Sequence, residues 1–225
     1  MNHPTLVFPT DPPPELLAIR VELRNATDAS TVGNLDLAIT HPRCAELLAS
    51  KGWGLDPASC LRLPMYLQRA SRSIEAWAEL HALLSPDHPA LSYGVSGRIL
   101  WLATNHSQIY DKMRIFLQRE GKPALAACYS VMSYVYEADN WRDNIADLRA
   151  HHIATRDASA SLRSYRDPGL IESTLTRDLR RANLLGAVPA LIQWTRQTLK
   201  TRLPTAGNAL LDPIRTVLGV TESYP

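Results

Sequence analysis

Apolar residues recur at the spacing of an α-helix over most of the chain. Residues 64–84 place them three or four positions apart, which is typical of an amphipathic helix: Leu67, Ala70, Ile74, Trp77 and Leu80. Residues 96–120 repeat the pattern, and Gly121 is placed to end that helix. Residues 124–152 are apolar almost all round as far as Tyr136, which predicts a largely buried helix over 122–138. The pattern therefore predicts a mainly α, multi-helix domain.

One short segment departs from this spacing. In LDLAIT every second residue is a large apolar one: Leu35, Leu37 and Ile39. Successive side chains of a β-strand point to opposite faces, so a period of two indicates a strand. The sequence therefore predicts one short N-terminal strand, residues 34–40, in an otherwise helical chain.

Prolines, small residues and charges divide the chain into four parts. Residues 1–33 are expected to form an extended leader, in which prolines exclude a helix, and then a short helix from Glu15 to about Arg24. Residues 34–154 form a helical core domain with one strand. Residues 155–169 (TRDASASLRSYRDPG) lack an apolar face, which predicts a flexible linker or loop. Residues 170–225 form basic C-terminal helices.

The composition is that of a folded protein. Of 225 residues, 45% are hydrophobic and 20% are charged, which excludes a disordered or fibrous chain. No apolar run approaches the roughly 20 residues that cross a bilayer, and the first residues lack the basic and apolar regions of a signal peptide. The cysteines, Cys44, Cys60 and Cys128, lack metal-ligand spacing and fit buried thiols in a reducing compartment. We expect a cytoplasmic protein that does not contact a membrane.

The net charge of +2 conceals an uneven distribution of basic residues. Residues 1–141 contain 12 basic and 14 acidic side chains, whereas residues 142–202 contain 11 basic and 6 acidic ones. Ten of those eleven are arginine, whose planar guanidinium matches the oxygens of phosphate and carboxylate groups. We therefore expect this region to contact the phosphate backbone of a nucleic acid or an acidic protein partner, although an arginine-rich solvated surface explains the same charges. The predicted nucleic-acid-binding residues are Arg149, Arg156, Arg163, Arg166, Arg177, Arg180, Arg181, Arg196, Lys200 and Arg202.

The sequence contains no strong catalytic or metal-binding motif. Four residues follow one another at i+4 spacing on one predicted helix face: Asp139, Asp143, Asp147 and His151. A dinuclear carboxylate site needs Glu-x-x-His on two helices, which this chain lacks, and neighbouring arginines can pair with the aspartates. A glycine-rich phosphate loop and the CxxC and HExxH motifs are also missing. We therefore predict no catalytic residue, no metal and no cofactor.

A strand followed by helices is also the order of elements in a ribbon–helix–helix protein. There, two strands pair across a dimer and enter the major groove of DNA. The outward side chains of residues 34–40 include Asn34 and Thr40, whose amide and hydroxyl groups suit base edges. Asp36 on the same face would be repelled by phosphate. A strand that pairs a homodimer without contacting DNA explains the same alternation.

Three short blocks, in the same order, resemble a family of integrating conjugative element proteins that includes the transcriptional activator AcaB. The blocks are LDLAITHPRCAELL, RLPMYLQRAS and YGVSGRILWLATNHSQIYDK, about a fifth of the chain. The acidic, tryptophan-rich segment expected between the second and third blocks is missing. The resemblance implies a protein of a bacterial mobile element, with a ribbon–helix–helix-like DNA-binding dimer as one role.

Three hypotheses of function follow. The first is a non-enzymatic helical protein that binds nucleic acid or is a subunit of a nucleoprotein complex, a regulator from a mobile element being one form. The second is a protein–protein adaptor or scaffold, anchored by the five tryptophans and eight tyrosines. The third is an enzyme with an unrecognised helical active site, for which the first residues to test are Tyr129, Tyr134, Glu137, Asp143 and His151.

Overall fold

The computed structural model describes residues 13–51, 54–85, 88, 98–150, 173–201, 203–204 and 208–222, of which 98–105, 140–150 and 173 are described by their backbone alone. The predicted linker, residues 155–169, and most of the leader lie outside this part of the chain. Each described element is a helix, so the chain is mainly α, as predicted. The elements are α1 (Pro14–Thr31), α2 (Leu35–Ala49), α3 (Pro57–Cys60), α4 (Arg62–Arg69), α5 (Ser73–Ala82), α6 (Arg98–Arg119), α7 (Pro123–Ala150), α9 (Ser173–Arg181), the 3-10 helix η2 (Leu185–Ala187), α10 (Val188–Thr198) and α11 (Leu211–Leu218).

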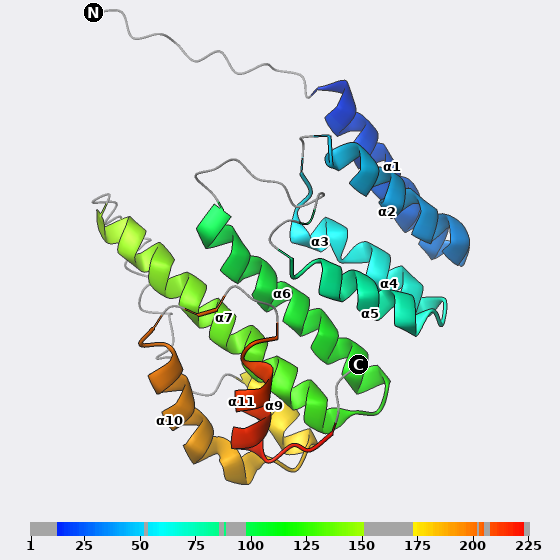
Figure 1. Ribbon diagram of the computed structural model, residues 1–225. Helices are drawn as coiled ribbons and strands as arrows, with labels where there is room; N and C mark the ends of the chain where they lie inside the picture. Colours follow the sequence, from blue (N-terminus) through cyan, green and yellow to red (C-terminus); the bar gives the residue numbers. More distant parts are fainter. Residues whose placement is uncertain are drawn as a thin grey trace, which may run out of the picture.

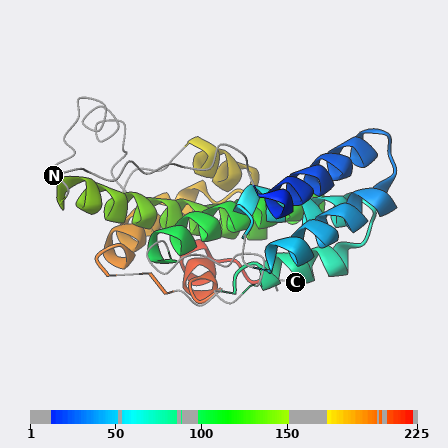
Figure 2. The same ribbon diagram turned by 90° about the horizontal axis from the view of Figure 1, so that it is seen from above.

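Consecutive helices pack in pairs (Figure 1). The pairs are α1 with α2, α4 with α5, and α6 with α7. The α1–α2 pair lies at one end of the molecule, whereas α9, α10 and α11 gather around α7 at the other. Seen from above, α9 and α11 lie on opposite sides of the α6–α7 pair (Figure 2). The basic C-terminal helices are therefore assembled on α6 and α7, away from α1.

The α6–α7 pair forms the centre of the hydrophobic core. On α6, Tyr110, Met113 and Leu117 are three or four residues apart and fully buried. On α7, every residue from Leu125 to Met132 is buried, which confirms the buried helix predicted at 122–138. Gly121 ends α6 as predicted, with a φ of 74° that glycine adopts without strain. Since burying one large apolar side chain contributes about 1.5–3 kcal/mol, this pair supplies much of the stability of the fold.

Aromatic side chains fill the space between α5, α6 and α7. The ring of Trp77 meets the ring of Phe116 edge-on at 5.9 Å between centroids, and the ring of His106 meets that of Tyr136 at 5.1 Å. Trp77 Nε1 donates a hydrogen bond to Glu120 Oε1 at 2.9 Å. Burial lowers the pKa of His106, so its imidazole is a neutral member of the core.

The strand predicted at residues 34–40 is wrong, because these residues are the N-cap and first turns of α2. Asn34 Oδ1 accepts a hydrogen bond from the Leu37 amide at 3.2 Å, which is the bond of a helix cap. The buried residues of α2 have helical spacing rather than alternation: Ala38, Ile39, Pro42, Ala45 and Ala49. Leu37, the middle residue of the three that alternate, is 48% exposed. Six residues are too few to separate a period of 2 from one of 3.6.

Two helix boundaries also differ from the predicted ones. The first helix does not stop near Arg24: α1 continues to Thr31, because Ala26 and Ala29 are buried and α1 packs along α2. The single helix predicted over 64–84 is two, α4 and α5, separated at Ser71. The φ of Ser71 is 60°, in the left-handed region that interrupts a helix.

All three cysteines are free thiols. Cys60 and Cys128 are buried as predicted, but Cys44 is exposed on α2. Burial raises the pKa of the Cys128 thiol to about 12. None of the helices described here combines the length and the apolar content that a membrane span requires.

Candidate nucleic-acid interface

Three arginines lie on the exposed side of α9. Arg177, Arg180 and Arg181 are all exposed, and their spacing of three and four residues places them on one side of the helix. Leu175 and Leu179, on the opposite side, are fully buried. The apolar side docks α9 on the core and holds the arginines outward.

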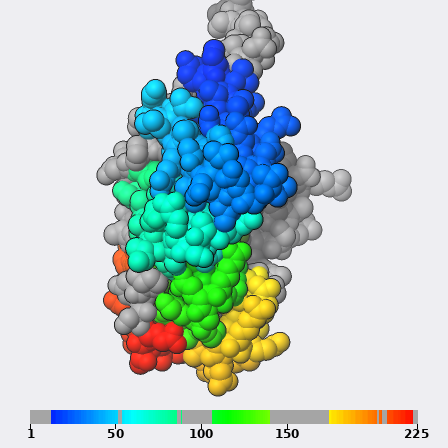
Figure 3. Space-filling view, turned by 90° about the vertical axis from the view of Figure 1, so that its right-hand side faces the viewer, coloured from blue at the N-terminus to red at the C-terminus, as the bar shows by residue number. Residues whose placement is uncertain are grey.

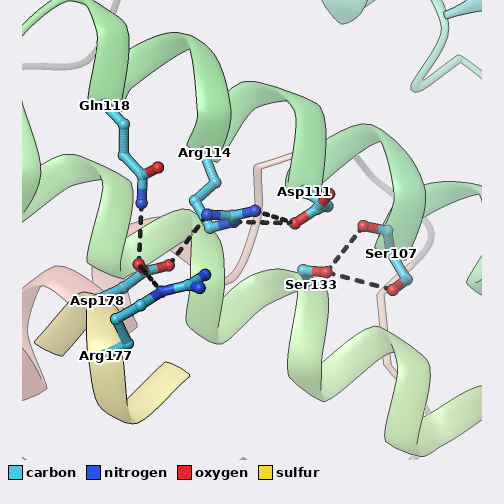
Figure 4. A network of polar contacts seen from close by, with 7 residues as sticks. All are labelled: Ser107, Asp111, Arg114, Gln118, Ser133, Arg177 and Asp178. Carbon is cyan, nitrogen blue, oxygen red and sulfur yellow. Dashed lines mark hydrogen bonds and ion pairs between the residues drawn. The ribbon is translucent and has the colours of Figure 1, made fainter. Parts of the chain in front are cut away.

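The acidic residue of α9 points inward. Asp178 is 1% exposed and accepts hydrogen bonds from Arg114 Nη1 at 3.3 Å and from Gln118 Nε2 at 2.9 Å, both on α6 (Figure 4). Arg114 is held in turn by Asp111, whose Oδ1 accepts a hydrogen bond from Arg114 Nε at 2.8 Å. A buried charge is stable only with such partners, so the network fixes the rotation of α9 about its axis. That rotation removes Asp178 from the surface that carries the arginines.

The exposed arginine nearest to Asp178 keeps most of its charge in solvent. Arg177 Nε lies 3.7 Å from Asp178 Oδ1, yet the side chain of Arg177 is 53% exposed while that of Asp178 is 1% exposed. Asp178 also serves Arg114 and Gln118, so Arg177 shares a carboxylate that is largely occupied. The guanidinium of Arg177 is therefore open to a further anionic partner.

Two more cations lie at the C-terminal end of α10. Arg196 is exposed in the last turn of that helix, and Lys200 is exposed two residues after the helix ends. Helix α10 packs on η2 and α11. Over residues 173–201 every exposed charged side chain is cationic, since Asp178 is buried. The surface of this segment is therefore uniformly positive.

The structure covers only part of the predicted contact set. It brings Arg177, Arg180 and Arg181 together on α9 and places Arg196 on α10, with Lys200 just after that helix. Arg149 belongs to α7, where the backbone alone is described. The remaining predicted contacts lie outside the described residues: Arg156, Arg163, Arg166 and Arg202.

The two residues predicted to contact bases lie in α2 and its cap. Asn34 caps the helix, and Thr40 Oγ1 donates a hydrogen bond to the Asp36 carbonyl at 2.8 Å. Both side chains therefore form hydrogen bonds with backbone groups of the helix that contains them. Residues 34–40 form no ribbon, so the ribbon–helix–helix interpretation loses its structural basis.

The residues singled out for an enzyme do not meet in one site where they are described. Tyr129 is fully buried among the aromatic rings, whereas Glu137 is exposed eight residues further along α7, about 12 Å along the helix axis. The side chains of Asp143 and His151 lie outside the description. Among the described residues, no group of three or more His, Cys, Asp and Glu side chains is placed to hold a metal ion.

Sequence reasoning missed a second group of arginines. Arg20 and Arg24 on α1 and Arg62 on α4 line one hollow at the surface, at the end of the molecule far from α9. The net charge of residues 1–141 is negative, so composition hides the group. The i,i+4 spacing of Arg20 and Arg24 is the signal that the sequence offers for it.

In comparisons with known proteins, no family model, curated protein or solved structure matches this chain. Its function is therefore inferred from the side chains that its own fold brings to the surface.

Proposed function

We propose that this protein binds nucleic acid without catalysing a reaction on it, either alone or as a subunit of a nucleoprotein complex. Arg177, Arg180 and Arg181 of α9 would contact the phosphates. The observation that carries the proposal is the inward rotation of Asp178, which leaves cations as the exposed charges of residues 173–201. Arginine suits this role, because its guanidinium makes two parallel hydrogen bonds to a phosphate.

Phosphate contact would relieve a repulsion within α9. Arg177 and Arg181 are four residues apart, and like charges at that spacing destabilise a helix by about 0.2–0.5 kcal/mol. A phosphate between them turns this repulsion into two attractions. Arg180 and Arg181 also lie in the last turn, where cations favour the helix dipole whether or not a ligand is present. Arg177 lies one turn earlier and gains no stabilisation from the helix dipole. Of the three arginines, it therefore gives the strongest support for a phosphate-binding role.

The proposal extends to the predicted cations on either side of α9, most of them beyond the described residues. Such a surface binds phosphate groups whatever the base sequence. The resemblance to conjugative-element proteins would make the chain a regulator of a bacterial mobile element that acts in the cytoplasm. The further contact residues are Arg149, Arg156, Arg163, Arg166, Arg196, Lys200 and Arg202.

The test is a salt titration of binding to random duplex and to single-stranded oligonucleotides. The triple variant R177Q/R180Q/R181Q should bind more weakly, and each lost contact should reduce the slope of log K against log salt by about 0.9 for duplex or 0.7 for single strands. Each exposed substitution of this kind usually changes stability by about 0.5 kcal/mol or less. The variant should therefore remain folded, and its melting is measured before its binding.

Two controls separate a contact surface from a general effect of charge. The variant R177K/R180K/R181K keeps the charge and should keep most of the salt slope. The variant R43Q/K51Q neutralises two exposed cations near α2 and should bind like the wild type. A folded R177Q/R180Q/R181Q that retains the wild-type slope would exclude α9 as the contact surface.

A specific observation also favours the adaptor hypothesis. The α1–α2 pair exposes large apolar side chains: Leu17 by 46%, Val21 by 54% and Leu47 by 67%. Exposed apolar groups that cluster on one part of a monomer mark surfaces that bind other proteins. If the wild type shows no salt-dependent binding to either oligonucleotide, the adaptor function replaces the first proposal. L17S/V21S/L47S should then lose the proteins that co-purify with the wild type.

A further inference from the structure

A hollow of about 450 Å³ lies between α1 and the start of α4. Five of its six lining residues come from α1, at the spacing of a single helix face: Arg20, Leu23, Arg24, Thr27 and Asp28. The sixth is Arg62, the first residue of α4. The hollow thus combines three guanidinium groups and one carboxylate, a net charge of +2.

Two of the three arginines have no partner in the described part of the chain. Arg20 and Arg24 are exposed, and neither makes an ion pair or a hydrogen bond there. They are four residues apart on α1, so their charges repel each other. An anion in the hollow would offset this repulsion.

Arg62 is already held in position. Its Nη1 donates hydrogen bonds to the Leu23 carbonyl at 2.8 Å and to Thr27 Oγ1 at 3.0 Å. Thr27 Oγ1 in turn donates to the same Leu23 carbonyl at 3.1 Å, which closes a small ring of hydrogen bonds. These bonds use one nitrogen of the guanidinium, and its other two nitrogens make no hydrogen bond within the described part of the chain. A side chain that is fixed before binding loses little entropy when the ligand arrives.

We propose that this hollow, lined by Arg20, Arg24 and Arg62, is a binding site for the phosphate groups of a ligand. Its net charge of +2 matches a multiply charged anion, and guanidinium groups match phosphate oxygens in geometry. Its volume exceeds what one phosphate group fills, so it suits linked phosphates. Leu23 gives the hollow one apolar wall.

This site is separate from the nucleic-acid surface proposed for α9. The α1–α2 pair lies at one end of the molecule and α9 at the other, which Figures 1 and 3 show from two directions. A small phosphate compound in the hollow therefore does not reach Arg177, Arg180 or Arg181. An experiment can therefore contradict one of the two proposed sites without contradicting the other.

The experiment is a calorimetric titration of the full chain with inorganic pyrophosphate at constant ionic strength. The wild type should bind, and R20Q/R24Q should bind about tenfold more weakly or worse, since each arginine supplies charged hydrogen bonds. Asp28→Asn removes the one carboxylate and should strengthen binding, an effect that a damaged fold does not produce. R177Q/R180Q/R181Q should bind pyrophosphate like the wild type, whatever it does to nucleic acid.

Three results would overturn the proposal. They are no binding of pyrophosphate by the wild type, equal binding by R20Q/R24Q, and equally tight binding of malonate, a dianion without phosphorus. Competition in the R177Q/R180Q/R181Q background then identifies the source of the phosphates. If a single-stranded oligonucleotide displaces pyrophosphate, the ligand is a nucleic-acid backbone; if it does not, the ligand is a small phosphate compound. Either outcome of that competition supports the site.

Discussion

Arg114 on α6 and Asp178 on α9 are 64 residues apart in the sequence and form an ion pair with an N–O distance of 3.3 Å. Their side chains are only 8% and 1% exposed. Asp111 and Gln118 supply the remaining hydrogen bonds, so both buried charges are satisfied. The pair ties the basic helix α9 to the core and decides which of its sides faces solvent.

Removing one member of this pair should be costly. We expect Asp178→Ala to lower the free energy of unfolding by about 3–5 kcal/mol, because it removes the buried one of the two carboxylates that pair with Arg114 and leaves that charge in the core with Asp111 alone. Urea unfolding measures the loss. The matched control is Asp212→Ala, which removes the 74% exposed carboxylate paired with Arg215 and should cost about 1 kcal/mol or less. Equal costs for the two substitutions would contradict a structural role for Asp178.

The stability of the protein should fall as the pH rises through the range set by Glu46. Burial and the carboxylate of Glu79 raise the pKa of Glu46 from 4.5 to about 7, against the opposing charge of Arg43. Between these values the folded protein keeps a proton that the unfolded chain releases, so unfolding becomes easier with rising pH. Glu46→Gln should therefore be more stable than the wild type by about 1–3 kcal/mol at about pH 8 and equal to it near pH 4.

Urea unfolding at several pH values tests this expectation. Glu79→Gln provides a second check, because removing that charge lowers the Glu46 pKa and moves the pH-dependent range downward. Parallel stability curves for the wild type and Glu46→Gln would show that Glu46 titrates normally.

Ser71 sits in a backbone conformation that disfavours a side chain. Its φ is 60°, and the left-handed region costs a non-glycine residue about 1–2 kcal/mol. Ser71→Gly should raise the melting temperature, by a stabilisation of up to about 1 kcal/mol once the added freedom of the unfolded chain is subtracted. Asn183→Gly, at a φ of 58°, should gain less, since asparagine tolerates this conformation. A melting temperature lowered by Ser71→Gly would contradict the strain.

Amide exchange should be slowest in the first half of α7. The amides from Ala126 to Met132 lie in a fully buried stretch beyond the unpaired first amides of the helix, so they open only with the core. Helix α1 serves as an internal comparison, because it has one exposed side and lies at the end of the molecule. Exchange in α7 as fast as in α1 would contradict the central place of the α6–α7 pair.

Long, strongly patterned helices were the predictable part of this fold. Helix α7 followed from an apolar run that only a core accommodates, and the end of α6 followed from Gly121. The start of α2 was not predicted correctly, because the short alternation of apolar residues indicated a strand. The signal for a helix was Asn34, whose side chain caps α2 by accepting a hydrogen bond from the amide three residues on. The end of α1 could not be predicted either. Packing along α2 extends this helix beyond the point that its own apolar spacing indicates.

The candidate sites depend on tertiary contacts that a sequence does not display. Charge counting found Arg177, Arg180 and Arg181, but the burial of Asp178 among them is a consequence of docking on Arg114. The count of charged residues also made the first 141 residues acidic overall. It averaged the charges of side chains that the fold places far apart, and so it concealed the arginines of the hollow. Only the packed structure brings Arg62 beside Leu23 and Thr27.

The separation of Arg114 and Asp178 along the chain has a consequence for biosynthesis. A ribosome makes the chain from its N-terminus, so α6 and α7 emerge from it before α9 does. During that interval Arg114 has Asp111 beside it but lacks the second carboxylate, and the apolar patch that Leu175 and Leu179 later cover is open to water. Nascent chains of this length expose the kind of surface that chaperones bind and that aggregation recruits. We therefore expect the chain to be most prone to aggregation between the emergence of α7 and the docking of α9.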